Sequence, residues 1–206
     1  MYVPRAFAET DLAALDRLIE RDSFVTLVGI VDGVPHATHL PVLYRRDDQH
    51  VELRGHLARP NPQARVAGPV LAIVHGPHAY VSPGWYPDKE AQSRVPTWNY
   101  AVAHLEGELE LFDDEPSVAS IVDALSVHHE FAVGGDWRFE HERDDHRSQL
   151  RGIVGFRLVP RRIQLTFKLN QNHPAANRLS VAANLDSLAQ GTGPEVARLM
   201  RERTPV

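Results

Sequence analysis

The sequence contains no cysteine among its 206 residues. This absence excludes disulfide bonds, zinc sites with thiolate ligands and thiol catalysis, and it fits an intracellular location. Long hydrophobic runs are absent too, since no segment approaches about 18 unbroken apolar residues. The opening residues, MYVPRAFAETD, lack the apolar region of a signal peptide. We therefore expect a cytoplasmic protein with no membrane-spanning helix.

Positively charged residues are fewer than negatively charged residues. The formal net charge is −5 and the isoelectric point is near 6.2, which argues against a broad nucleic-acid-binding surface. Hydrophobic residues make up 43% of the chain and charged residues 24%, as is typical of a globular protein that buries a core. The length predicts a single domain over residues 1–206.

Histidine, in contrast, is abundant, with 12 residues in the sequence. His36 and His39 are three apart, so on a strand they point to opposite faces and cannot chelate one ion. His75 and His78 flank a Gly-Pro step that we read as a turn at a strand end, and neither a carboxylate nor a third histidine lies nearby in the sequence. We predict no metal site, and interpret this stretch as the wall of a pocket or a dimer contact.

Hydrophobic periodicity predicts a mainly β protein with helices at its start, middle and end. Asp32-Gly33 is a strong signal for a two-residue hairpin turn. Strands are expected over residues 24–31, 34–44, 50–57, 69–76, 97–112, 152–159 and 161–169. Helices are expected over residues 10–22 and 117–133, and in the C-terminal region at about 174–202. This pattern favours a small β-barrel decorated with helices.

Several segments together resemble one family. They are MYVPRAF, ATHLPVL, GHLARPNPQ, LAIVHGPHAYVSPGWY, VPTWNYAVAHLEGELE and FKLNQNHPAANRLSV. These segments resemble the PaiB family, which is described as FMN-binding negative transcriptional regulators. The resemblance runs from Met1 to about Leu185 and is weakest between Ser117 and Gln149. It implies a dimeric FMN-binding split β-barrel, and therefore FMN as cofactor and a homodimer.

The resemblance places the FMN phosphate at the stretch GHLARPNPQ. His56 and Arg59 are the cationic candidates, and Asn61 and Gln63 are the neutral donors. Free N–H groups at a helix start and a guanidinium group both suit phosphate oxygens. The alternative is that Arg59 is a solvated surface residue and that Asn61 only caps a short helix.

Other residues are implied for the flavin ring. In the split barrel the backbone of ATHLPVL runs beside the ring, so Thr38, His39 and Leu40 are candidates for contacts with its edge. Trp98 could supply a stacking wall, while Asn99 could bind the pyrimidine edge. The alternative is that Trp98 simply belongs to the core. The second hairpin adds Lys168 and Gln171, which could reach the flavin or its phosphate from either subunit.

Two functions remain open at this stage. One is an FMN-binding negative transcriptional regulator with a protein or DNA partner, and the other is a flavin-dependent oxidoreductase that acts on a small molecule. Arg161 and Arg162 form a basic pair, but strand alternation would place them on opposite faces, and no helix-turn-helix pattern is visible. The sequence also lacks a GxSxG motif and a phosphate-binding loop. No catalytic residue can be assigned.

Overall fold

The computed structural model describes residues 1–188 and 191–204, so residues 189–190 of the predicted C-terminal helical region lie outside it. The chain divides into two compact units. Unit 1 comprises Met1–Leu18, His75–Ala103 and Gln164–Val206. Unit 2 comprises Ile19–Val74 and His104–Ile163. No helix of the described residues is long and apolar enough to cross a membrane.

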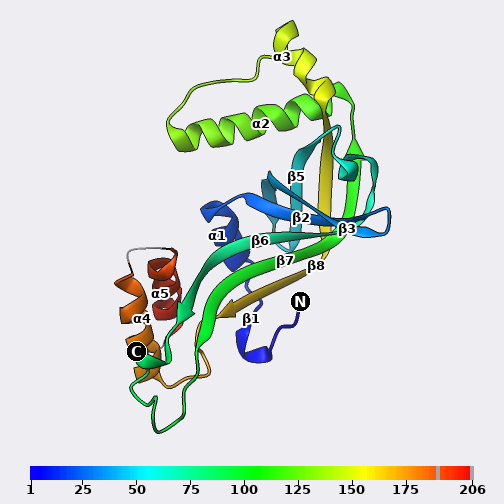
Figure 1. The fold of residues 1–206 in the computed structure, drawn as a ribbon. Helices are drawn as coiled ribbons and strands as arrows, with labels where there is room; N and C mark the ends of the chain where they lie inside the picture. The colour runs from blue at the N-terminus through cyan, green and yellow to red at the C-terminus, as the bar shows by residue number, and fades with distance from the viewer. Residues whose placement is uncertain (189–190, 205–206) are drawn as a thin grey trace. The chain divides into compact units, whose positions relative to one another are not determined.

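The strands form one eight-stranded sheet in the order β3-β2-β6-β7-β8-β5-β4, and β1 pairs with β8. The strands are β1 (Ala8–Glu9), β2 (Phe24–Val31), β3 (Val34–Pro41), β4 (Leu43–Asp47), β5 (His50–Ala58), β6 (Gly68–Val81), β7 (Thr97–Phe112) and β8 (Ile153–Lys168). The long strands β6, β7 and β8 each contribute residues to both units (Figure 1). The predicted mainly β architecture is confirmed.

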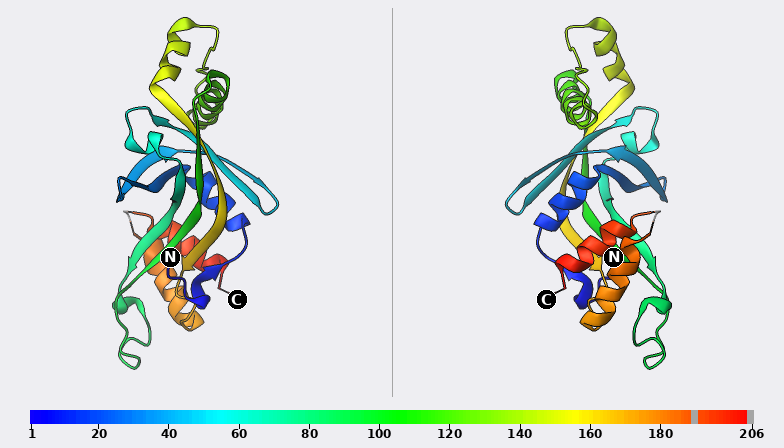
Figure 2. Two further views of the ribbon diagram at one scale, coloured as in Figure 1. Left: turned by 90° about the vertical axis from the view of Figure 1, so that its right-hand side faces the viewer. Right: turned by 90° about the vertical axis from the view of Figure 1, so that its left-hand side faces the viewer.

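Helices lie before, within and after the strand-rich part of the chain. The α-helices are α1 (Ala13–Arg21), α2 (Glu115–Val133), α3 (Asp144–Gln149), α4 (Ala175–Asp186) and α5 (Gly193–Glu202). Short 3-10 helices are η1 (Arg5–Phe7), η2 (Pro62–Arg65), η3 (Pro83–Trp85) and η4 (Leu150–Gly152). Figure 2 shows α4 and α5 packed side by side in unit 1.

The turn between β2 and β3 forms as the sequence predicts. Val31 pairs with Val34, so Asp32 and Gly33 make a two-residue loop. Their φ angles are 52° and 78°, the left-handed region that Asp-Gly tolerates and that this hairpin turn requires. The local sequence therefore fixes the register of the whole β2–β3 pair.

Strand β6 corrects one expectation. The predicted turn at Gly76-Pro77 is wrong, because the strand continues unbroken from Gly68 to Val81. Gly76 permits this continuity through its missing side chain: a Cβ atom there would lie 2.7 Å from the Ala101 carbonyl oxygen and 2.7 Å from Leu18 Cδ2. Pro77 lacks an N–H group, but the pairing of β6 with β2 covers only Val70–Ile73, so no hydrogen bond of that ladder is lost.

A similar correction applies to β8, where two strands joined at Pro160 were expected. The structure has one strand from Ile153 to Lys168. In unit 2, Gly107 of β7 lies against this proline, since a Cβ atom on Gly107 would stand 2.7 Å from the Val159 carbonyl oxygen and 3.1 Å from Pro160 Cα. Because Gly107 has no side chain, β7 can approach Pro160 closely, and β8 continues through the proline without a break.

Each unit buries its own apolar residues. In unit 1, helices α4 and α5 contribute fully buried side chains, among them Val181, Leu185 and Val196. In unit 2, Leu53 of β5 and Leu158 of β8 are cross-strand partners and both are fully buried. Alternation of buried and exposed residues along β5 and β7 leaves one face of each strand free to present polar groups.

Candidate functional site

Three of the predicted FMN ligands form one hydrogen-bonded group in unit 2. Asn61 Nδ2 donates to Thr38 Oγ1 at 2.9 Å, and the Thr38 hydroxyl donates to Gln63 Oε1. The Gln63 amide nitrogen donates to the carbonyl oxygens of His36 at 3.2 Å and Leu27 at 3.4 Å. Gln63 is 2% exposed, so this group ties η2 firmly to strands β2 and β3.

Local sequence explains why these side chains meet. Asn61 caps η2 by accepting a hydrogen bond from the Gln63 N–H at 2.9 Å, and Pro62 occupies the first position of that helix. Gly29 of β2 leaves room for Gln63, because a Cβ atom there would lie 3.0 Å from the Gln63 amide nitrogen. The cap was expected from the sequence, whereas its link to Thr38 was not.

The neighbours of Thr38 on β3 follow the predicted alternation. Leu40 is 4% exposed and belongs to the core of unit 2. His39 is exposed and turns the other way, where its Nδ1 lies 3.0 Å from the Thr26 hydroxyl and its ring stacks on Phe24 at 6.5 Å. Of the three predicted residues on this strand, Thr38 is therefore the one that joins the polar group at η2.

The guanidinium group of Arg59 is already engaged in unit 2. Its Nε donates to the Arg151 carbonyl oxygen at 2.8 Å and its Nη2 to the Ile153 carbonyl oxygen at 2.9 Å. Its Nη1 lies 3.4 Å from Asp113 Oδ2, beside a cavity of about 240 Å³ that Glu115 also lines. These carboxylates reduce the net positive charge that Arg59 offers to a phosphate. Sequence reasoning missed them because they lie more than 50 residues away along the chain.

His56 lies on β5 opposite Gly155. Its Nδ1 is buried and has no hydrogen-bond partner among the described residues. Burial lowers the pKa of His56, so the free ring is neutral near pH 7 and acts as a hydrogen-bonding group rather than as a cation. A buried nitrogen without a partner is unusual in a folded protein and is the kind of group that a ligand satisfies.

The other four predicted residues lie in unit 1. Trp98 on β7 is 52% exposed, whereas its neighbour Asn99 is fully buried. The Asn99 amide nitrogen lies 3.3 Å from Met200 Sδ of α5, and its oxygen has no partner among the described residues. A contact between Asn99 and a flavin would therefore require Met200 to move.

Lys168 and Gln171 lie at the end of β8 and in the turn after it. Lys168 Nζ donates to the Thr97 hydroxyl at 2.5 Å, and burial lowers the pKa of this lysine. The Gln171 side chain closes its own turn, because it accepts from the Leu169 N–H at 2.7 Å and donates to the Phe167 carbonyl oxygen. Lys168 is thus held against the first residue of β7, and Gln171 shapes the chain around it.

A second polar group in unit 1 was not predicted. The ring of Tyr86 stacks on His173 with centroids 4.9 Å apart, and its hydroxyl accepts from Asn170 Nδ2 at 2.9 Å. Arg94 stands over the same ring at 5.8 Å and forms a two-point ion pair with Asp88 at 2.9 and 2.5 Å. No sequence motif marks this group, because its members come from two segments, residues 86–94 and 170–173, that are far apart in the sequence.

The Asp88–Arg94 pair predicts a pH effect on stability. Hydrogen bonds from Arg94, and then from Asn177, lower the pKa of Asp88 from its usual 3.8 to about 2. The stabilisation is therefore complete above the unfolded-state pKa and is lost as pH falls towards about 2. We expect Arg94→Gln to lower the melting temperature at pH 7, with the difference from the parent protein closing between pH 4 and 2. A difference that stays constant over this range would contradict the assignment.

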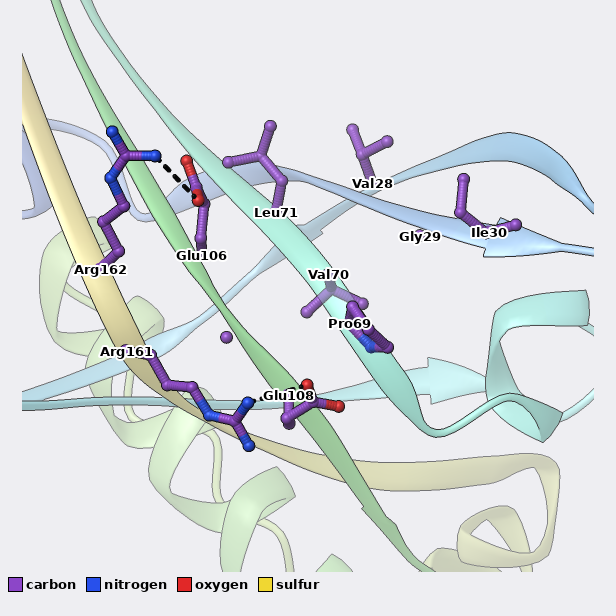
Figure 3. A pocket seen from close by; sticks show the side chains of 11 residues that line it. Val28, Gly29, Ile30, Pro69, Val70, Leu71, Glu106, Glu108, Arg161 and Arg162 are labelled. Atoms are coloured by element: carbon purple, nitrogen blue, oxygen red, sulfur yellow. Dashed lines mark hydrogen bonds and ion pairs between the residues drawn. The ribbon is translucent and has the colours of Figure 1, made fainter.

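A groove of about 420 Å³ in unit 2 brings the basic pair Arg161 and Arg162 together (Figure 3). Arg161 Nη1 lies 3.2 Å from Glu108 Oε1, and Arg162 Nη1 lies 3.5 Å from Glu106 Oε2. The expectation of opposite faces is wrong, since both side chains reach the neighbouring strand β7 from the same side. Paired with glutamates, they offer little net positive charge to a nucleic acid.

No group of three or more metal-binding side chains occurs among residues 1–188 and 191–204. The comparison with protein families matches residues 1–162 to a family described as "Putative FMN-binding domain". The chain belongs to this family. The Bacillus subtilis protein named "Protease synthase and sporulation protein PAI 2" is 30% identical over an alignment that covers 98% of both chains, which confirms the PaiB family.

Three further similar proteins extend this result. An uncharacterized protein of Emericella nidulans is 25% identical, with 98% of this chain and 97% of the relative covered. Among solved structures, the FAD and heme binding protein of Mycobacterium smegmatis has a TM-score of 0.53 at 16% identity, covering 78% of this chain and 73% of its own. The flavocytochrome Anf3 of Azotobacter vinelandii also has a TM-score of 0.53, at 17% identity, covering 81% and 72%. These likenesses confirm the split β-barrel fold of this PaiB-family member.

Proposed function

We propose that this PaiB-family protein binds FMN as a homodimer and acts as a negative transcriptional regulator. The observation that carries the FMN proposal is the buried Nδ1 of His56, which has no hydrogen-bond partner within residues 1–188 and 191–204. It lies in the same unit as the polar group of Thr38, Asn61 and Gln63. Imidazole, amide and hydroxyl groups are the kinds of donors that a phosphate and a flavin edge require.

In this proposal the residues of unit 2 hold the cofactor through its polar groups. His56 and Arg59 would bind the phosphate with Asn61 and Gln63 as neutral donors, while Thr38, His39 and Leu40 would line the ring edge. FMN would supply reversible one- and two-electron chemistry. Trp98, Asn99, Lys168 and Gln171 of unit 1 remain proposed contacts of the ring or phosphate. The residues described supply orientation and hydrogen bonds, and no catalytic acid or base is assigned.

The regulatory role is supported by the family to which the chain belongs. The basic pair gives little support to direct DNA binding, because Arg161 and Arg162 are paired with glutamates. We therefore propose that regulation works through a protein partner or through the state of the flavin. A flavin-dependent oxidoreductase is the second candidate, favoured by a half-exposed aromatic pocket described below, and steady-state turnover with NADH or NADPH would distinguish the two.

The test is a titration of the flavin-free protein with FMN, FAD and riboflavin, followed by light scattering of the loaded sample. We expect FMN to bind more tightly than riboflavin, because riboflavin lacks the phosphate, and we expect the mass of a dimer. Flavin released from the purified protein should be FMN by chromatography. A preference for FAD, or no flavin bound after reconstitution, would contradict the proposal; a monomer with FMN bound would remove the dimer alone.

A further inference from the structure

Two of the segments that carry the family resemblance meet in one cavity of unit 1. HGPHAYVSPGWY contributes His78, Tyr80 and Trp85, and VPTWNY contributes Trp98. The cavity has a volume of about 400 Å³ and is completed by Ala79, Leu188, Gly191, Thr192 and Gly193. We refer to it as the aromatic pocket. Its volume lies within the range of about 300–1,000 Å³ that holds small molecules.

Two aromatic rings of this pocket are about half exposed to solvent. Trp98 is 52% exposed and Tyr80 is 46% exposed. Tyr80 meets Trp98 edge to face, with centroids 6.3 Å apart and planes at 71°, and His78 lies 5.7 Å from the same indole at 45°. Large aromatic side chains normally bury most of their surface in the core. Adjacent rings with open faces instead offer a surface on which another flat ring can stack.

The walls of the aromatic pocket are held in place. Thr192 Oγ1 accepts from the His78 N–H and donates to the His78 carbonyl oxygen, both at 2.8 Å, which fixes β6 to the start of α5. Ser180 Oγ donates to the Trp85 carbonyl oxygen at 2.6 Å and fixes η3 to α4. Because the walls of the pocket are already ordered, a ligand binds with little entropic cost for ordering them.

The chemistry of the lining limits the ligand. None of the nine lining residues is an aspartate, glutamate, lysine or arginine. The Thr192 hydroxyl is already bonded twice to His78. A charged group would therefore lose hydration without gaining an acidic, lysine or arginine side chain as an ion-pair partner, whereas an aromatic ring would gain stacking of about 0.5–1.5 kcal/mol beyond burial.

We infer that the aromatic pocket binds an uncharged planar aromatic molecule, as a substrate or effector separate from FMN. A phosphate-bearing flavin favours lysine or arginine partners, and the described lining residues include neither. This inference goes beyond the proposed function and does not depend on it, but it reassigns Trp98 from the flavin to this pocket. If Trp98 were instead the wall of the flavin site, FMN and the aromatic molecule would compete for the same face of its indole ring.

The test uses coumarin as the planar probe and octahydrocoumarin as a saturated control of similar size. The chain has three tryptophans, so in a Trp137→Phe background the two that remain, Trp85 and Trp98, both line the pocket. We expect coumarin, added to the FMN-saturated protein, to quench their fluorescence and to bind in calorimetry. Octahydrocoumarin should bind about two- to tenfold more weakly, because it cannot stack.

Variants at position 98 locate the binding. Trp98→Ala should weaken coumarin about tenfold, whereas Trp98→Phe, which keeps an aromatic ring and guards against a general loss of folding, should retain most of the affinity. The inference is overturned if coumarin fails to bind, if Trp98→Ala leaves its affinity unchanged, if the saturated control binds equally well, or if saturating FMN abolishes binding. Failure of the FMN proposal would appear separately, as an absence of flavin binding in the same samples.

Discussion

Replacing Arg59 by alanine is expected to weaken FMN binding about tenfold to more than a hundredfold while leaving riboflavin binding nearly unchanged. The reason is the loss of a charge-assisted hydrogen bond to the phosphate, which contributes about 1.5–3 kcal/mol. The measurement is a fluorescence titration of the flavin-free variant with both flavins. Arg17→Ala provides the matched control, because it removes the same charge from an exposed position on α1 in unit 1.

The contacts of Arg59 within the protein mean that the titration with riboflavin is needed to separate a loss of phosphate binding from a structural effect. Its guanidinium also holds the carbonyl oxygens of Arg151 and Ile153, so alanine at position 59 releases two main-chain acceptors next to β8. A structural effect of this kind would weaken both flavins to a similar extent. Equal losses for FMN and riboflavin, or no loss for either, would assign Arg59 to the structure of unit 2 and move the phosphate proposal to Lys168.

Gly76→Ala is expected to lower the free energy of unfolding by about 1–3 kcal/mol, the usual cost of forcing extra volume into a packed interior. A Cβ atom at this position would stand 2.7 Å from the Ala101 carbonyl oxygen and 2.9 Å from Ala101 Cβ. The first of these is main chain and cannot rotate away. Because β6 and β7 both belong to the sheet, relief requires one of these strands to shift.

Gly152→Ala is the control for this substitution. An added Cβ atom at Gly152 meets no atom within 4 Å, so the free energy of unfolding should change little, or rise by a few tenths of a kcal/mol as the unfolded chain loses freedom. Urea unfolding of the three proteins measures the comparison. If Gly76→Ala and Gly152→Ala unfolded at the same urea concentration, the close approach at Gly76 would not be a constraint on the fold.

Local sequence predicted the elements whose signals are local. The Asp32-Gly33 turn is one example, and the cap of η2 by Asn61 is another, since each depends on residues within four positions of one another. Continuity of β6 through Gly76-Pro77 was not predictable, because it depends on Ala101 and Leu18, which are distant in sequence. Breaker residues permit a strand when a neighbouring element accommodates them, and only tertiary structure shows that neighbour.

The candidate site divides in the same way. Thr38, Asn61 and Gln63 were predicted separately, and their direct hydrogen bonds are a property of the fold. The partners of Arg59 and the burial of Asn99 beneath Met200 were not visible, because carbonyl oxygens and packing partners leave no sequence motif. The aromatic pocket was suggested only in part: its loop was interpreted as a pocket wall, but its meeting with Trp98 required the sheet.

The division of the chain affects how it can fold during synthesis. Unit 2 is made of residues 19–74 and 104–163, whereas unit 1 needs residues 1–18, 75–103 and 164–206. On the ribosome every segment of unit 2 is available before α4 and α5 have been made. Pairing of β1 with residues 165–166 of β8 must wait until that part of the chain has been made. Contacts between residues so far apart in the sequence form slowly. Until then the aromatic residues of β6 and β7 lack the C-terminal residues that line the aromatic pocket with them, so the nascent chain exposes additional apolar surface to which chaperones can bind.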